Sequence, residues 1–559
     1  MEVVAFVIGT SGLISVAEVC LAIARAIDGT RAFKEESASL YAMYNFEQVR
    51  LALWIAHVVG VTDSPIDIDT LQIEERSLPA MLTRESPINL HAPLHGALTE
   101  VARILKKINN LLDKYGANEA SVSRRILFQT RIFKEGGKDE IKELLGQLKN
   151  WNDSLNGVVE SRMRRHLLSN MHVRLLSAAQ TDRELEVIQG AAQGTHPSLG
   201  DEAAFRRQIL GIESRREGEP SGLMVSSGAL SPSLPPPIKN GTLRAMGTIA
   251  RPGKRSIRVL QEWKHGQINW GDLERTIATD RADRLASVLR LEHKPPKLRC
   301  LDLVAYTMTD GPRGRLDFGY FYHPPPFANG MTLPLTLQAA LATLSERRRP
   351  TLTQRFGMAA ALAESLLAFH TASWLHKAVW SANILFFADA HTEMLDFRQP
   401  FVAGFEFARP DTVRDLTIDR SAGGAVGFEA YCHPELVASL TGDGDRGRRR
   451  YQRRFDIYGL GVVLLEIGCW MTAATILQSR QGMDGSSHDH LYETAREALP
   501  SRAGTKYKQA VCACLDWEED ENEAEDGLGA DELRAQRQRQ IEKFANNVVA
   551  VLRDCHCSL

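Results

Sequence analysis

The chain of 559 residues lacks an excess of charge of one sign, a dense set of cysteines and a long apolar run. Its 67 Lys and Arg balance 69 Asp and Glu to a formal net charge of -2, so the chain as a whole has no electrostatic footprint for nucleic acid. Its 8 cysteines are scattered through a sequence far too long to be a disulfide scaffold. We therefore predict reduced thiols in an intracellular compartment and no nucleic-acid partner.

Two Cys-x-Cys pairs, Cys512/Cys514 and Cys555/Cys557, raise the question of a zinc site. Structural zinc sites usually show Cys-x-x-Cys pairs or histidines at set spacing, and His556 alone stands nearby. We therefore expect no metal here and interpret these residues as small buried side chains and a frayed tail.

The length, with 44% hydrophobic and 24% charged residues, is enough for at least two ordinary soluble domains. The patterns below predict an N-terminal all-α helical bundle over residues 1–200. A Pro/Ser/Gly-rich linker is predicted over 201–250, and an α+β domain of two lobes over 251–559, with the small lobe at 251–325 and the large lobe at 326–559.

The chain begins with an uncharged, apolar stretch, residues 3–17. As a helix it spans about 22 Å, less than the roughly 30 Å hydrocarbon core of a bilayer, and a longer span would bury Glu18. Glu2 precedes the stretch and no basic residue does, so no secretory signal is predicted. Two interpretations stay open, a core helix of the bundle and a membrane effector released on activation. The membrane-insertion candidates are Val3, Phe6, Ile8, Gly9, Gly12, Leu13 and Ile14.

Apolar residues at helical spacing then recur without strand signals to about Glu184, which predicts the all-α bundle. Three faces carry this pattern: Phe46, Val49, Leu53, Trp54 and Val58; Val101, Ile104, Leu105, Ile108, Leu111 and Leu112; and Ile141, Leu144, Leu145, Leu148, Trp151 and Leu155.

Several short motifs in this region, taken in order, resemble the HeLo domain of the fungal HET-s and HET-S incompatibility proteins, of the prion-inhibition and propagation type. They are the apolar, glycine-bearing start, residues 49–54 (VRLALW) with Val59-Gly60 after them, residues 111–116 (LLDKYG) and residues 151–155 (WNDSL). The resemblance covers roughly the first 200 residues. It implies a bundle that self-associates and acts on membranes.

From Gly190 to about Gly253 the composition shifts toward Ser and Pro, and periodicity disappears. Such a stretch buries too little apolar surface to order itself, so we predict a linker, semi-rigid near the run of prolines at 235–237. A docking peptide for a proline-binding module is the less favoured alternative.

The stretch 361–409 has the outline of the catalytic and metal loops of a protein kinase: an apolar helix, a loop, a strand, and a second short strand. Kinases use the pattern H-R-D-x-x-x-x-N followed by D-F-G. Here His376-Lys377-Ala378 stands where His-Arg-Asp belongs, and Asn383 keeps its identity. The stretch therefore resembles a protein-kinase-like domain that has lost its chemistry, a pseudokinase.

Three segments compete for the place of the metal-binding Asp. A literal Asp317-Phe318-Gly319 lies upstream of the catalytic loop, so we reject it. Asp396 opens Asp-Phe-Arg at a plausible distance after Asn383. We favour the later register, in which Gly404 takes the place of the metal-binding Asp and no metal is bound.

Lys264 ends an alternating strand and is the best candidate for a lysine that pairs with nucleotide phosphates. No G-x-G-x-x-G precedes it, and the helix near 281–291 offers Arg284, Ser287 and Arg290 instead of the expected Glu. Lys264 and Asn383 are therefore weak candidates for nucleotide binding, and a solvated strand lysine is at least as favoured. We expect no cofactor, with ATP as a weak ligand at most.

Three further residues match the architecture of a kinase large lobe. Pro434 and Glu435 resemble the Ala-Pro-Glu end of an activation segment. Asp456 begins an apolar helix, where its carboxylate can hold the backbone of the catalytic loop.

A HeLo-like bundle followed by a degenerate kinase resembles fungal HeLo proteins, and its layout resembles necroptosis effectors of plants and animals. The resemblance implies a regulated, membrane-active protein of programmed cell death or heterokaryon incompatibility, cytoplasmic with conditional association to the plasma membrane. Its expected partners are membrane lipids, further copies of itself and an upstream signalling protein. The alternatives are a pseudokinase scaffold without membrane activity and an atypical active kinase.

Overall fold

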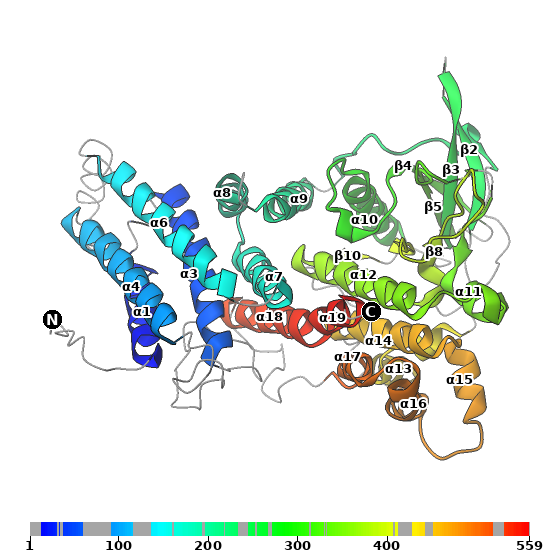
Figure 1. Cartoon of the computed structure of the whole chain (residues 1–559). Helices are drawn as coiled ribbons and strands as arrows, with labels where there is room; N and C mark the ends of the chain where they lie inside the picture. The colour runs from blue at the N-terminus through cyan, green and yellow to red at the C-terminus, as the bar shows by residue number, and fades with distance from the viewer. Residues whose placement is uncertain are drawn as a thin grey trace. The chain divides into compact units, whose positions relative to one another are not determined.

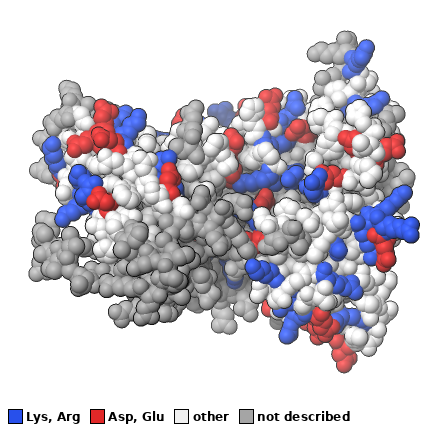
Figure 2. Space-filling model, in the orientation of Figure 1, with Lys and Arg blue, Asp and Glu red and all other residues white. Residues whose placement is uncertain are grey.

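The computed structural model describes residues 13–28, 30, 33, 37–59, 91–115, 136–158, 161–192, 196–216, 218–232, 244–251, 254–265, 271–311, 315–328, 330, 332–405, 408–411, 427–441, 451–517 and 530–557. The chain divides into two compact units, Met1–Ala203 and Ala204–Leu559 (Figure 1). Each unit is treated below by itself. On the face shown in Figure 2, basic and acidic residues are interspersed over both units, in keeping with the balanced charge of the sequence.

The first unit is helical throughout its described residues. Its helices are α1 (Leu13–Asp28), α3 (Ala38–Val59), α4 (His91–Lys114), α6 (Gly137–Val158), α7 (Ser161–Ala178), α8 (Asp182–Ala192) and the start of α9 (Pro197–Glu213). The predicted apolar face of α4 is confirmed, because Val101, Ile104 and Leu105 are at most 1% exposed. Helix α3 packs against α1, α6, α7 and α8, which explains why both Leu51 and Trp54 are buried. The all-α prediction is confirmed for the part of this region that the structure describes.

Helix α1 is a core helix in the part whose side chains are described. Cys20, Ala24 and Ile27 are buried, Cys20 Sγ lies 3.4 Å from the Leu98 carbonyl oxygen, and the Tyr44 hydroxyl donates to the Ala24 carbonyl at 2.6 Å. The remaining membrane-insertion candidates are placed as follows: Leu13 and Ile14 lie in the first turn of α1, while Val3, Phe6, Ile8, Gly9 and Gly12 lie outside the described residues.

Among the described helices no single one has the length and apolar character to cross a membrane; α14 (Arg453–Cys469) with α15 (Ala473–Ser479), bent by 76°, meets that test as a pair.

The predicted linker over 201–250 contains regular structure in part of its described residues. Helix α9 continues to Glu213, a 3-10 turn (Ser227–Ala229) leads into β1 (Leu230–Ser231), and β2 (Arg244–Arg251) already belongs to the sheet. The sequence did not predict this helix and these strands, because its apolar residues are few and lie within a polar segment; Phe205, Ile209 and Ile212 are buried. These three side chains are buried against the second unit's core, so burial supplies the order that composition did not predict.

The second unit contains an antiparallel sheet in the order β1-β2-β3-β5-β4, with β3 (Lys254–His265), β4 (Leu303–Asp310) and β5 (Leu316–Tyr322). The sheet curls, because one segment joins both of its edges: Met224 bridges to Tyr306 of β4, and β1 pairs with β2. Helix α10 (Asp272–Arg290) shares a hydrophobic core with α9 and the sheet. Asp317-Phe318-Gly319 lies inside β5, where Asp317 binds Arg315 and His265.

The rest of this unit is mainly helical and is built around α12 (Leu352–Thr371) and α14 (Arg453–Cys469). Most residues of α12 and nearly all residues of α14 are buried. In α14, Ile457, Leu460 and Leu464 keep the predicted helical spacing and are at most 1% exposed. The elements are β6 (Leu335–Thr336), α11 (Leu337–Thr343), α12 (Leu352–Thr371), β7 (Trp374–Leu375), β8 (Ile384–Phe386), β9 (Phe401–Val402), β10 (Arg409–Pro410), α13 (Pro434–Thr441), α14 (Arg453–Cys469), α15 (Ala473–Ser479), α16 (Ser487–Arg502), α17 (Thr505–Leu515), α18 (Ala530–Phe544), a π-helix (Ala545–Ala550) and α19 (Val551–Cys557). The chain is therefore a helical unit followed by an α+β unit.

Candidate functional site

Asp456, in the first turn of α14, binds the backbone of the loop between β7 and β8. Its carboxylate accepts the backbone N–H groups of His376 at 2.8 Å and Lys377 at 2.7 Å, and the Tyr451 hydroxyl at 2.9 Å. This is the contact that the sequence led us to expect of Asp456. Burial lowers the pKa of His370, so a neutral imidazole donates its Nε2–H to the same carboxylate at 3.4 Å. Although burial opposes its ionisation, the bond from His370 and the other neighbours hold the pKa of Asp456 below its ordinary value.

Asn383 and Gly404 lie against each other where the loop meets the β8–β9 hairpin. Ile384 pairs with Val402, and the Ala403 N–H donates to the Asn383 carbonyl at 2.8 Å. Gly404 has φ +81°, and a Cβ placed there would lie 1.9 Å from Asn383 Nδ2. A side chain at this position would therefore be strained by the backbone and would have to displace the Asn383 amide.

A buried ion pair fills the space next to Asn383 and Gly404. Arg244 of β2 faces Glu262 of β3 across the sheet, with Nε 2.7 Å and Nη2 2.5 Å from Glu262 Oε1. The guanidinium also donates to the Ala382 carbonyl at 2.6 Å and to Asn383 Oδ1 at 2.6 Å. The Gly404 N–H reaches both Glu262 oxygens at 3.1 Å.

Arg244, Glu262 and Asn383, here named the Arg244 cluster, are each at most 6% exposed. A positive guanidinium thus occupies the point where the sheet, the loop and the hairpin converge. The sequence offered no signal for Arg244 or Glu262, because the two are joined only through the β2–β3 register.

Lys264 lies two residues beyond Glu262 on β3, paired with Phe318, and is partly exposed. Because side chains alternate along a strand, it is on the same sheet face as Glu262. Asn383 and Gly404 are instead contacted by Arg244 and Glu262, which lie opposite each other on β2 and β3. Nucleotide contact by Lys264 and Asn383 stays a prediction.

Asp396 lies in the connection between β8 and β9, away from the end of the hairpin that holds Asn383 and Gly404. Its carboxylate accepts from the backbone and guanidinium of Arg398 and from Gln399. These bonds, led by the Arg398 side chain, hold the pKa of Asp396 below its ordinary value. The structure therefore brings Gly404, and not Asp396, to Asn383.

Glu435 of α13 is bound by both Nη atoms of Arg454 of α14, at 3.1 and 2.9 Å, and Pro434 is the first residue of α13. A second carboxyl, Glu466 of α14, is fully buried and ties three elements together by accepting from Tyr431, Ser381 and the Ala473 N–H. Burial raises the pKa of Glu466 to about 7.

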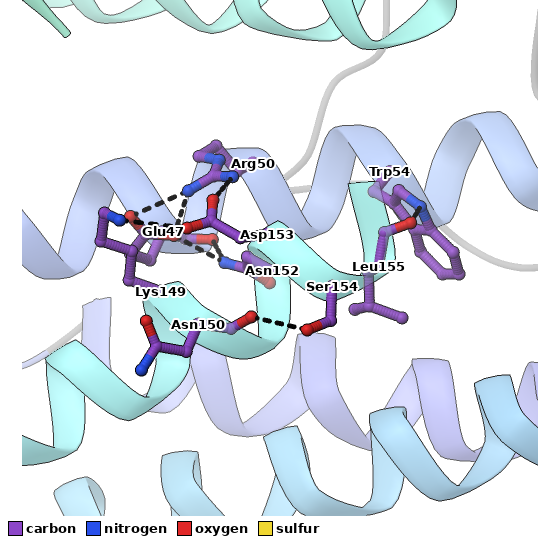
Figure 3. Close-up of polar contacts among 9 residues, drawn as sticks. All are labelled: Glu47, Arg50, Trp54, Lys149, Asn150, Asn152, Asp153, Ser154 and Leu155. Atoms are coloured by element: carbon purple, nitrogen blue, oxygen red, sulfur yellow. Dashed lines mark hydrogen bonds and ion pairs between the residues drawn. The ribbon is translucent and has the colours of Figure 1, made fainter. Parts of the chain in front are cut away.

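In the helical unit, the motifs of α3 and α6 meet in one polar cluster (Figure 3). Arg50 binds Glu47 at 2.9 Å and Asp153 of α6 at 2.6 Å, and Asn152 donates to Glu47 Oε2 at 2.9 Å. Trp54 donates its indole N–H to the Leu155 carbonyl at 3.0 Å. Burial raises the pKa of Glu47 despite Arg50 beside it. The residues that carry the sequence motifs at 49–54 and 151–155 are thus the ones that fasten α3 to α6.

Within the described part of the chain, no three His, Cys, Asp or Glu side chains are grouped so that they could hold a metal ion.

A family model described as a domain of unknown function, DUF7580, matches residues 329–554. The match includes the loop 376–383, Gly404 and Asp456, and covers less than half of the chain. No curated protein matches the chain.

Proposed function

We propose that the α+β unit is a protein-kinase-like domain without phosphoryl transfer, and that it regulates a membrane-active helical bundle of the HeLo type in programmed cell death or non-self recognition. Several contacts support the kinase-like frame. A loop ending in an Asn, a hairpin that returns beside it, and an Asp from a buried helix beneath the loop follow one another as in that fold.

The observation that carries the proposal is the Arg244 cluster. Phosphoryl transfer needs Mg²⁺ on an Asp and an Asn, a base beside the acceptor hydroxyl, and a Lys for the phosphates. Here the base position is Ala378, the position beside Asn383 is Gly404, and Asn383 Oδ1 accepts from an arginine. A guanidinium on this oxygen opposes a divalent cation by charge repulsion, and in this proposal it takes the place that a metal has in an active kinase.

A regulatory role is what remains for such a domain. Its buried ion pairs and the Asp456 contact fix the arrangement of the loop through contacts within the unit. We assign the effector role to the bundle, on its likeness to HeLo domains and on the apolar stretch at residues 3–17. Self-association of the bundle at the cytoplasmic face of the plasma membrane supplies the active state, after a signal from an upstream protein.

Toxicity on controlled expression in a eukaryotic host tests this function. Residues 1–203, the first compact unit, should arrest growth, and the full chain at the same level should not, because the α+β unit restrains the bundle. Residues 204–559 serve as the matched control for expression load. Equal, harmless expression of all three would contradict the effector role and favour a scaffold without membrane activity.

A further inference from the structure

Helix α10 carries an unusual polar face. In place of the Glu that would pair with a phosphate-binding lysine, its second half presents Asp283, Arg284 and Ser287. Asp283 and Ser287 are at most 7% exposed, so these groups need partners. The structure shows what they bind: residues 205–231, here named the strap, of which all but Glu217 are described.

Arg284 caps the end of α9. Its guanidinium donates to the carbonyls of Ile212 at 3.3 Å, Glu213 at 2.6 Å and Arg215 at 3.0 Å. The last carbonyls of a helix lack intrahelical partners and carry negative partial charge, so a cation is favoured there. Asp280, one turn earlier, orients the guanidinium from the other side at 2.7 Å.

Asp283 holds the next part of the strap. It accepts the Ser221 N–H at 3.0 Å and the Ser221 hydroxyl at 2.5 Å, and the Tyr306 hydroxyl of β4 at 2.8 Å. Arg215 of the strap reaches back to the Ser287 hydroxyl at 2.9 Å. Apolar contacts run beside these bonds, because Phe205, Ile209 and Ile212 share one core with the buried face of α10.

The strap also contacts β4, β2 and β7, the strand that precedes the loop of the candidate site. Val225 donates to the Tyr306 carbonyl on β4, and Leu230 pairs with Ile249 on β2, the strand that carries Arg244. At its other end, Glu213 accepts the indole N–H of Trp374 at 3.1 Å, two residues before His376. One segment thus contacts α10, β4, β2 and β7.

We propose that the strap is the coupling element of the α+β unit: it holds α10 and, through β2, the Arg244 cluster in place, and its release loosens both. The strap begins in α9, a single helix whose first residues belong to the helical unit, so a change in that unit reaches α10 through this segment. This inference rests on the proposed regulatory role, but the strap itself is tested without membrane or nucleotide.

Hydrogen exchange of the full chain, read by mass spectrometry, tests the coupling. Arg284→Met keeps the apolar stem and removes the cap. Exchange should rise about tenfold or more in three places, the strap, the second half of α10 and β2, because opening no longer has to break the charge-assisted bonds of Arg284. Helices α14 and α17 should keep their wild-type protection.

Two variants sharpen the test. Arg275, on the same helix, binds the exposed Asp310 at 2.5 Å. Arg275→Met should therefore leave the exchange rates of all three segments unchanged. Ser221→Ala removes one hydroxyl and should give a smaller rise in the same three segments, which keeps the test usable if Arg284→Met fails to fold.

The proposal is overturned if exchange rises only around residues 212–215 while α10 and β2 stay protected, or if Arg284→Met behaves like Arg275→Met. If residues 1–203 prove non-toxic while exchange rises in all three segments of Arg284→Met, the proposed function is contradicted and the coupling role of the strap is supported.

Discussion

Replacing Arg244 by Met should destabilise the α+β unit more than most single substitutions. The change removes three hydrogen bonds and an ion pair from the guanidinium and leaves Glu262, 3% exposed, without its cation. Removing one partner of a buried ion pair typically costs about 3–5 kcal/mol, because the remaining charge stays buried. Arg258→Met, an exposed position on the same hairpin, should stay within about 0.5 kcal/mol of wild type.

Urea unfolding of the full chain measures these free energies. Because the two units need not unfold together, Arg50→Met in the helical unit identifies the transition that belongs to the bundle. The double variant Arg244→Met/Glu262→Gln removes both charges but keeps an acceptor for the Gly404 N–H, so it should recover about 2 kcal/mol or more of the single variant's loss. The reasoning is refuted if Arg244→Met costs no more than Arg258→Met, or if the double variant is no more stable than the single one.

Three other outcomes are expected. Mg²⁺-ATP should leave the melting temperature unchanged and no autophosphorylation should occur, since Ala378 and Gly404 supply no carboxylate; a phosphorylation lost in Asn383→Ala or Asp396→Ala would show the opposite. Gly404→Asp should create no Mg²⁺ site and should lower the melting temperature, because φ is +81° and Cβ would lie 1.9 Å from Asn383 Nδ2; a Mg²⁺-dependent rise in melting temperature would contradict the clash. The stability of the α+β unit should fall as the pH rises from about 4.5 to 7, by on the order of 3 kcal/mol from Glu466 alone, because its pKa is raised to about 7 and the folded state keeps a proton that the unfolded chain has already released. Glu466→Gln should flatten that part of the pH profile, and an unchanged slope would mean that Glu466 titrates normally.

The sequence predicted those features that follow from residue spacing within a single helix. The apolar faces of α4 and α14 follow from spacing alone, and the Asp456 contact follows from its place at the start of a buried helix. The same pattern-based reasoning placed Gly404, and not Asp396, in the register that the structure brings to Asn383.

The features that escaped prediction depend on tertiary pairing. Arg244 and Glu262 are ordinary charged residues 18 positions apart until the β2–β3 register sets them opposite each other. The strap was interpreted as linker because its polar composition hides three apolar residues that are ordered by α10. In the sequence, the polar residues of α10 were noted only because a Glu was missing there. In the structure they bind a segment 62 to 71 residues earlier, as the Ser221 and Arg284 contacts show.

Leakage of dye from anionic lipid vesicles tests the central claim most directly. Purified residues 1–203 should release the dye, and the full chain should not. Because small residues let membrane helices pack closely, Gly9→Leu with Gly12→Leu in residues 1–203 should reduce the release. Circular dichroism should show that this variant fragment stays folded. Vesicles that stay sealed with folded residues 1–203, or that leak as fast with the full chain, would contradict a membrane-active bundle restrained by a kinase-like domain.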